Sequence, residues 1–172
     1  LGDEALALGA VHAGVSSVYG YPGTPSTEII EYLLEYAEEH GKPFVRWCSN
    51  EKTALEEALG ASFVGKRALV TMKHVGLNVA ADPFVNSALL GIKGGVVLAV
   101  ADDPGMHSSQ NEQDTRFYAD FARIICLEPR NQQEAYAMVR EAFDISEKYT
   151  VPVIVRLATR LSHSRAGVIP DD

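Results

Sequence analysis

Residues 95–101 have the sequence GVVLAVA, and this stretch decides the fold class. It contains only apolar residues and one glycine, so an extended segment here would need cover on both of its faces. A strand that is apolar on both faces is typical of the centre of a parallel sheet, because helices cover both sides of such a sheet. We therefore interpret residues 95–101 as the central strand of an α/β domain.

Strand-like and helix-like patterns alternate on both sides of this strand. The predicted strands are residues 16–21, 43–48, 67–72, 95–101, 124–127 and 151–157. The predicted helices are residues 3–13, 26–39, 50–64, 76–90, 115–122 and 132–148. Asp82 and Pro83 are expected to break or bend the helix at 76–90. Because the helices supply the crossovers that parallel strands need, we predict a doubly wound, mainly parallel sheet of about six strands with helices on both faces.

The length and charge of the chain limit its organisation and its partners. The chain has 172 residues and a formal net charge of −8, which argues against nucleic acid or an anionic membrane as the main partner. We place one domain at residues 1–160 and a linker or tail towards a missing domain at 161–172, because the chain turns polar after Thr159. Cys48 and Cys126 are expected to be buried free thiols of a cytoplasmic protein, with no iron–sulfur ligand set.

Several common site motifs are missing. The first strand is not followed by GxGxxG, and neither a P-loop nor GxSxG is present. His74, His107, Asp102 and Asp103 match no strong metal-ligand spacing, so no metal site is predicted. Ligands of parallel α/β sheets bind beyond the carboxyl ends of the strands, which directs attention to the polar segments there.

The first of these segments is residues 19–28, YGYPGTPSTE. Its two prolines and its glycine predict a rigid turn, and Thr24 or Ser26 is expected to cap the next helix with Pro25 in its first turn. Two interpretations remain open for this turn. It is either only a well-built start of a helix, or its helix N-terminus and the Thr24 hydroxyl face an anionic ligand.

Three further polar segments follow predicted strands. Glu51 in SNEK (49–52) is either a carboxylate that favours the start of a helix or a functional acid. In MKHVGLN (72–78), Gly76 allows a close approach of the backbone. The long polar stretch at 101–114 is either a mobile surface loop or a functional one.

Taken together, these segments resemble a known family. The stretches GDEALALGAVHAGVSSVYGYPGTPSTEI, TMKHVGLNVAADP and DDPGMHSSQNEQDTR are similar to the N-terminal part of the alpha subunits of indolepyruvate ferredoxin oxidoreductases. These enzymes are thiamine diphosphate-dependent 2-oxoacid:ferredoxin oxidoreductases. The resemblance covers nearly the whole chain and implies that this region is a pyrimidine-binding domain.

The resemblance also implies roles for particular residues. Glu51 would contact N1′ of the aminopyrimidine and act in catalysis, and His74 would assist proton transfer or bind substrate, although a purely structural histidine is equally open. Thr24 is the best-matched contact to the substrate carboxylate. Further residues implied beside the cofactor are Tyr21, Pro22, Gly23, Lys73 and Asn78. Gly23 replaces a bulkier residue of pyruvate-type relatives, which suggests space for an aryl substrate.

The implied reaction is the oxidative decarboxylation of an aryl 2-oxo acid to an acyl-CoA, with ferredoxin as electron acceptor. Thiamine diphosphate would be shared with a second, diphosphate-binding domain, because the chain has no GDG…N motif and its Gly2-Asp3 is followed by Glu4. Magnesium and 4Fe-4S clusters would belong to the holoenzyme and not to this chain. A partner subunit and homo-oligomeric contacts are expected, and the fragment alone is expected to be inactive.

Two other functions remain open at this stage. A non-oxidative, thiamine-dependent 2-oxo acid decarboxylase would share the fold and Glu51. A non-catalytic α/β module that binds a small ligand or a partner protein would explain the missing diphosphate motif.

Overall fold

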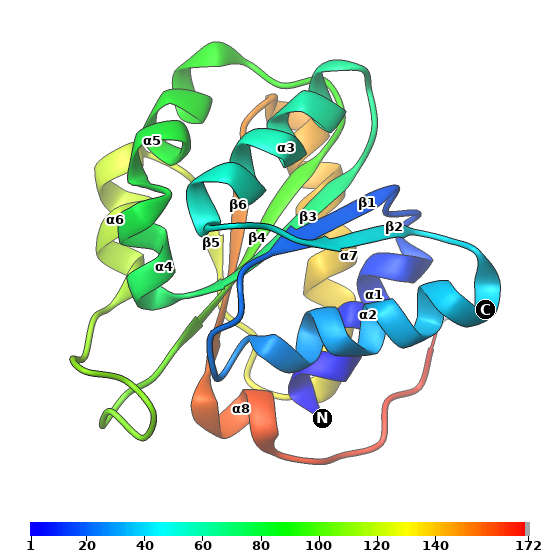
Figure 1. The fold of residues 1–172 in the computed structure, drawn as a ribbon, viewed down its shortest axis with the longest axis vertical. Coiled ribbons are helices and arrows are strands. Elements are labelled where there is room, and N and C mark those ends of the chain that lie inside the picture. Colours follow the sequence, from blue (N-terminus) through cyan, green and yellow to red (C-terminus); the bar gives the residue numbers. More distant parts are fainter. Residues whose placement is uncertain (171–172) are drawn as a thin grey trace.

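The computed structural model describes residues 1–170, and their six strands form one parallel sheet (Figure 1). The strands are β1 (Ser17–Gly20), β2 (Phe44–Trp47), β3 (Ala68–Lys73), β4 (Val96–Asp102), β5 (Cys126–Leu127) and β6 (Val153–Ala158). Their order across the sheet is β2-β1-β3-β4-β6-β5, and every neighbouring pair is parallel. The predicted doubly wound α/β class is confirmed.

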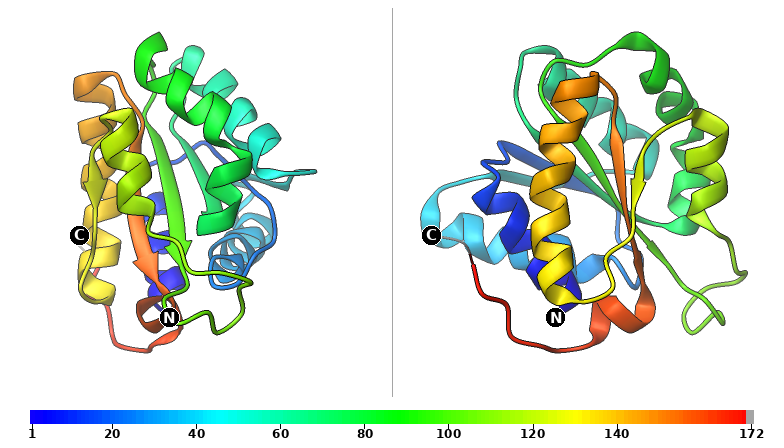
Figure 2. Two further views of the ribbon diagram at one scale, coloured as in Figure 1. Left: turned by 90° about the vertical axis from the view of Figure 1, so that its left-hand side faces the viewer. Right: turned by 180° about the vertical axis from the view of Figure 1, so that it is seen from behind.

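Helices cover both faces of this sheet (Figure 2). One face carries α1 (Gly2–His12), α2 (Thr27–His40) and α7 (Gln132–Tyr149). The other face carries α3 (Glu51–Phe63), α4 (His74–Val79), α5 (Ala81–Leu90) and α6 (Thr115–Ala122). A short helix, α8 (Thr159–His163), follows β6 and contacts α1.

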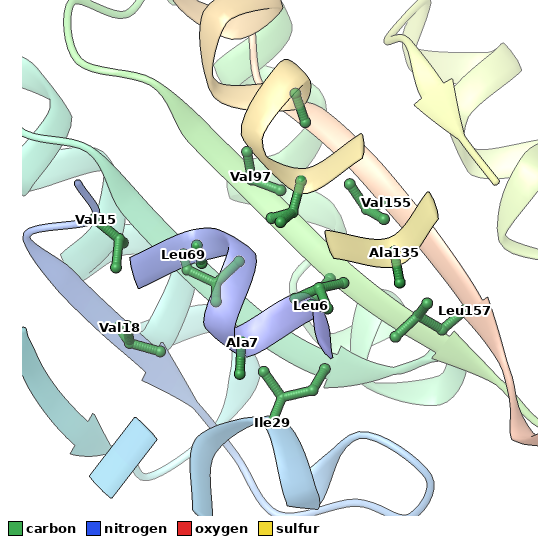
Figure 3. Close-up of a cluster of buried hydrophobic side chains, with 14 of the residues drawn as sticks. Leu6, Ala7, Val15, Val18, Ile29, Leu69, Val97, Ala135, Val155 and Leu157 are labelled. Carbon is green, nitrogen blue, oxygen red and sulfur yellow. The ribbon is translucent and has the colours of Figure 1, made fainter. Parts of the chain in front are cut away.

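The central strand β4 contributes to the core on both sides. Val97 and Ala99 belong to the cluster under α1, α2 and α7, whereas Val96 and Leu98 belong to the cluster under α3 to α6. Figure 3 shows the first cluster, in which Leu6 of α1 lies among side chains from the strands and from α2 and α7. Every residue of β4 is buried, as the GVVLAVA pattern predicts.

The expected break in the helix at 76–90 is confirmed, but it lies at a different residue. The helix predicted at 76–90 is two helices, which begin at His74 and Ala81 and meet at Ala80. Pro83 lies in the first turn of α5, where its missing N–H costs no bond of that helix but cannot continue the hydrogen bonds of α4.

The chain after Thr159 begins with α8 and then contacts the first turn of α7. Gln132 Nε2 donates to the carbonyl oxygen of Ser164 over 2.9 Å, and the Ile169 amide donates to Gln133 Oε1 over 2.8 Å. The polar composition of this segment reflects hydrogen bonds to the domain surface. The domain boundary at residue 160 stays a prediction.

Both cysteines are free, as expected, but they differ in burial. Cys48 is buried, whereas Cys126 is only partly buried. Burial raises the pKa of the Cys126 thiol to about 11, which keeps this thiol protonated and unreactive near neutral pH.

Candidate functional site

The carboxyl ends of the strands lie at one edge of the sheet, since all strands are parallel. The chain passes from β1 to β2 on one side and then crosses to β3 on the other side of β1, with α2 and α3 on opposite faces. Open α/β sheets bind ligands at such a reversal of strand order. The turn after β1, the start of α3, the start of α4 and the loop after β4 all begin at this edge (Figure 1).

Glu51 is the first residue of α3, where the Asn50 side chain caps the helix by accepting from the Thr53 amide over 2.9 Å. Its side chain is largely buried, with 7% of the residue exposed. Among residues 1–170, the Glu51 carboxyl group has no hydrogen-bond or ion-pair partner. Because buried carboxyl groups are normally hydrogen-bonded, the group is available to a ligand.

Gly76 of α4 packs closely against this carboxyl group. A Cβ atom added to Gly76 would lie 2.5 Å from Oε1 and 2.7 Å from Cγ of Glu51. The close backbone approach predicted for Gly76 is therefore confirmed, and the group that it approaches is Glu51. Gly76 lines one side of the Glu51 carboxyl group. A larger residue at position 76 would displace this carboxyl group.

His74, the first residue of α4, is 1% exposed. Its Nε2 lies 3.1 Å from the carbonyl oxygen of Asn111, and since a carbonyl only accepts, Nε2 carries the proton. The other ring nitrogen, Nδ1, is buried without a hydrogen-bond partner among the described residues. His74 thus binds the loop after β4 with one nitrogen and keeps the other for a ligand or a proton.

The turn after β1 is closed by its own hydroxyl groups. Ser26 Oγ donates to the Gly23 carbonyl oxygen over 2.7 Å, and the Gly23 amide donates to Thr27 Oγ1 over 3.0 Å. The predicted capping is therefore wrong: Ser26 occupies the N-cap position but its side chain makes no cap bond, and Pro25 precedes the helix. Tyr21, Pro22 and Thr24 are exposed at the edge of the sheet.

Lys73, the last residue of β3, lies against this turn. A Cβ atom on Gly23 would be 3.0 Å from Cδ of Lys73, so the lysine stem crosses directly over the glycine. Lys73 Nζ donates to the Ser108 carbonyl oxygen over 3.4 Å, and Ser108 Oγ donates to the Thr24 carbonyl oxygen over 3.2 Å. The turn after β1, the end of β3 and the loop after β4 are therefore in contact with one another.

The loop after β4 is anchored by Asp103, which is fully buried. Its carboxylate accepts from the Ser108 amide over 2.8 Å and from the hydroxyls of Ser109 and Thr159, each over 2.7 Å. Burial by itself would raise the pKa of Asp103, but these hydrogen bonds outweigh it and hold the pKa well below its usual range. The anchoring role of Asp103 was not predicted, although an acid directly after an apolar strand is a visible signal in the sequence.

Asn78 of α4 makes none of these contacts. It is exposed, and its Oδ1 accepts from the Tyr118 hydroxyl of α6 over 2.7 Å. The structure thus brings Thr24, Lys73 and His74 into contact with the loop after β4. It places Gly23 against Lys73 and Glu51 against Gly76, while Asn78 contacts a different helix.

Comparison with known proteins connects this geometry to a family. A family model described as "Pyruvate flavodoxin/ferredoxin oxidoreductase, thiamine diP-bdg" matches residues 8–171. The chain belongs to this family. The resemblance inferred from its motifs is confirmed, because relatives named as indolepyruvate oxidoreductase subunits are about half identical to it over nearly its whole length.

Two of these relatives are named indolepyruvate oxidoreductase subunit IorA. The protein of Archaeoglobus fulgidus is 51% identical over 98% of this chain, and that of Thermococcus kodakarensis is 49% identical over 98%. The 2-oxoglutarate synthase subunit KorA of Methanothermobacter thermautotrophicus is 31% identical over 99% of this chain. This chain spans only 27% and 26% of the length of the two IorA relatives and 47% of KorA.

A solved structure supports the fold. The 2-oxoglutarate:ferredoxin oxidoreductase from Magnetococcus marinus superimposes with a TM-score of 0.82 over 94% of this chain and 29% of that chain, at 22% sequence identity. At this level of identity the match concerns the fold alone. The family is thus one of oxidoreductase subunits, and this domain has their architecture.

The residues at the edge of the sheet fit the thiamine diphosphate that the family description implies. An aminopyrimidine presents donors and acceptors at its ring edge, and Glu51 offers a buried carboxyl group without a partner. His74 Nδ1 is a second buried polar atom without a partner. Within residues 1–170, no three His, Cys, Asp or Glu side chains are grouped so that they could hold a metal ion, and no helix is long and apolar enough to cross a membrane.

Proposed function

We propose that this chain forms the pyrimidine side of a thiamine diphosphate site in an oxidoreductase that converts aryl 2-oxo acids, such as indolepyruvate, to acyl-CoA and reduces ferredoxin. The observation that carries the proposal is the Glu51 carboxyl group, which is buried, without a partner and pressed against Gly76 at the ligand-binding edge of the sheet. Membership of the family supports the choice of cofactor.

Thiamine diphosphate, when bound, supplies the nucleophilic carbon that attacks the keto group of a 2-oxo acid. Glu51 would hold and exchange a proton at N1′ of the aminopyrimidine, which favours the tautomer that can act as a base. The backbone at Gly76 packs against this carboxyl group and leaves no room for another side chain on that side. Partial burial of Glu51 therefore serves the chemistry, because a hydrogen bond is stronger where water is excluded.

The substrate would lie between the turn after β1 and the loop after β4. The exposed Thr24 hydroxyl has no hydrogen-bond partner among residues 1–170, and it would donate to the substrate carboxylate. Tyr21, Pro22, Gly23 and Asn78 would line the approach to the cofactor. His74 Nδ1 would take or give a proton near the reacting carbons, while Nε2 remains bound to Asn111.

The aryl substrate is supported by the indolepyruvate names of the relatives with about 50% identity. The absence of a side chain at Gly23 leaves space beside Thr24, although part of that space is filled by the stem of Lys73. The proposal includes coenzyme A as acyl acceptor and ferredoxin as electron acceptor. It also includes a diphosphate-binding domain with its magnesium ion, a partner subunit that carries 4Fe-4S clusters, and homo-oligomeric contacts. We propose a cytoplasmic location for the complex.

The test is a Glu51→Gln variant of the full-length subunit, assembled with its partner subunit. We expect the variant to fold and to lose most of its indolepyruvate-dependent reduction of ferredoxin, about 10²-fold or more, because glutamine cannot exchange the proton. Glu57→Gln on the same helix, which removes a carboxylate away from the edge, serves as the control. Turnover by Glu51→Gln at the wild-type rate would refute the role, and aldehyde formation by the wild-type enzyme without ferredoxin reduction would indicate a non-oxidative decarboxylase.

A further inference from the structure

The edge of the sheet contains one ammonium group that has no counterion. The strand-end segments 21–26, 48–52, 73–78 and 101–114 contain no arginine and only two lysines, Lys52 and Lys73. Lys52 Nζ is paired with Asp82 over 2.8 Å. Lys73 is half-buried, and among residues 1–170 no carboxylate lies within ion-pair distance of its Nζ. The contact that Lys73 Nζ makes is exposed, so an anion can reach this ammonium group and accept charge-assisted hydrogen bonds from it.

The position of this ammonium group is determined by two neighbours. The lysine stem lies across Gly23, with a Cβ position there only 3.0 Å from Lys73 Cδ. Its Nζ makes a single long contact of 3.4 Å to the Ser108 carbonyl oxygen, and Ser108 also binds the carbonyl oxygen of Thr24. The Lys73 ammonium group therefore emerges beside Thr24, whose hydroxyl has no hydrogen-bond partner within the described chain.

We propose that Lys73 binds the carboxylate of the 2-oxo acid substrate, together with the Thr24 hydroxyl, and that it is not a cofactor contact. This inference rests on the proposed function, which supplies the anionic substrate. An ammonium group and a hydroxyl on adjacent segments offer charge-assisted hydrogen bonds to the two oxygens of one carboxylate. The weak contact to Ser108 leaves the other donors of the ammonium group for this purpose.

The test uses the full-length subunit in complex with its partner subunit and compares Lys73→Met with Lys73→Arg. For Lys73→Met we expect the KM for indolepyruvate to rise by about 10- to 100-fold, the loss typical of one charge-assisted hydrogen bond, with a much smaller fall in kcat. Lys73→Arg should recover part of the loss. The dissociation constant of thiamine diphosphate, measured by titration calorimetry, should change by less than about twofold.

Two inhibitors of the same shape test the charge directly. Indole-3-propionate carries the carboxylate, and its methyl ester does not. Wild-type enzyme should bind the acid more tightly than the ester, and Lys73→Met should lose this preference. The matched control is Lys93→Met, since Lys93 is exposed before the amino end of β4, at the opposite edge of the sheet, and its removal should leave all these constants unchanged.

The possible results separate this inference from the proposed function. An unchanged KM in Lys73→Met, or a large rise in the dissociation constant of thiamine diphosphate without a change in KM, would overturn the assignment of Lys73 while the enzyme still turned over indolepyruvate. A wild-type complex that turned over no 2-oxo acid would instead refute the proposed function, and the identity of the anion with it.

Discussion

The backbone of Gly76 lies against the carboxyl group of Glu51, so closely that a Cβ atom on the glycine would stand 2.5 Å from Oε1. The two residues come from different helices, α4 and α3, which follow different strands. Their contact determines where the carboxyl group points, because the flexible end of Glu51 would have to move if Gly76 carried a side chain. The site is therefore sensitive to a single methyl group at position 76.

For this reason we expect Gly76→Ala to reduce activity far more than stability. Alanine is the better helix former by about 1 kcal/mol, which partly offsets the steric cost, but the methyl group displaces the Glu51 carboxyl group. We expect turnover to fall by about 10-fold or more, with the melting temperature within a few degrees of wild type. Gly60→Ala in α3, where a Cβ atom would meet nothing within 4 Å, is the control and should retain full activity.

Substitutions at Gly23 should separate the position of Lys73 from the size of the substrate. In Gly23→Ala, the new methyl group would press on the lysine stem at 3.0 Å, a contact that the flexible side chain relieves by a small shift. We expect a several-fold rise in KM for both indolepyruvate and pyruvate. Gly23→Ile would affect indolepyruvate much more than pyruvate if the glycine makes room for an aryl group. Equal effects on both substrates in kinetic assays would assign Gly23 to the packing of Lys73 alone.

Asp103→Asn should loosen the loop after β4. An amide oxygen accepts more weakly than a carboxylate, so the bonds from the Ser108 amide and the Ser109 and Thr159 hydroxyls weaken, at a cost of about 1–3 kcal/mol. Because the pKa of Asp103 is lowered in the folded protein, its contribution to stability is complete above the unfolded pKa, near 4, and is lost as the pH falls further.

The measurement for Asp103 is hydrogen exchange of residues 103–114 together with denaturant unfolding. We expect faster exchange in the loop of Asp103→Asn at pH 7, and a stability difference from wild type that shrinks below about pH 4. Asp120→Asn, which alters an exposed acid on α6, should change neither quantity. A difference from wild type that persists unchanged at pH 2 would contradict the role of the ionised carboxylate.

For Asp3 we expect stability to depend on pH in the opposite direction. It is fully buried in α1, its oxygens have no partner in normal hydrogen-bond geometry among residues 1–170, and burial raises its pKa to about 8 despite the neighbouring Ser162 hydroxyl. Since the folded state holds the proton more tightly than the unfolded state, stability is greatest below about pH 4 and falls as the pH rises towards 8.

Accordingly, Asp3→Asn should stabilise the protein at pH 9 relative to wild type and should make little difference at pH 4. Thermal unfolding of the full-length protein at the two pH values measures this effect. The effect should be one of a few kcal/mol at most, because local opening around α1 limits the penalty. Equal melting temperatures of the variant and wild type at pH 9 would show that Asp3 finds a partner in the intact protein.

The sequence by itself determined the class of fold and the position of the site at the carboxyl ends of the strands. Hydrophobic periodicity depends on local backbone geometry and on which face is buried, so the alternation of strands and helices was visible without coordinates. The same periodicity located the ends of the strands, and with them Glu51, Lys73 and His74.

Only the tertiary structure decided which side chains meet. The contacts of Gly76 with Glu51, of Lys73 with Gly23 and of Asp103 with Thr159 each join segments that are distant in the sequence. Such contacts depend on the order of the strands and on how helices cross the sheet, which no local pattern encodes. For the same reason α8 was missed, since its polar residues Thr159 and His163 contact Asp103 and Glu28 instead of forming a periodic pattern.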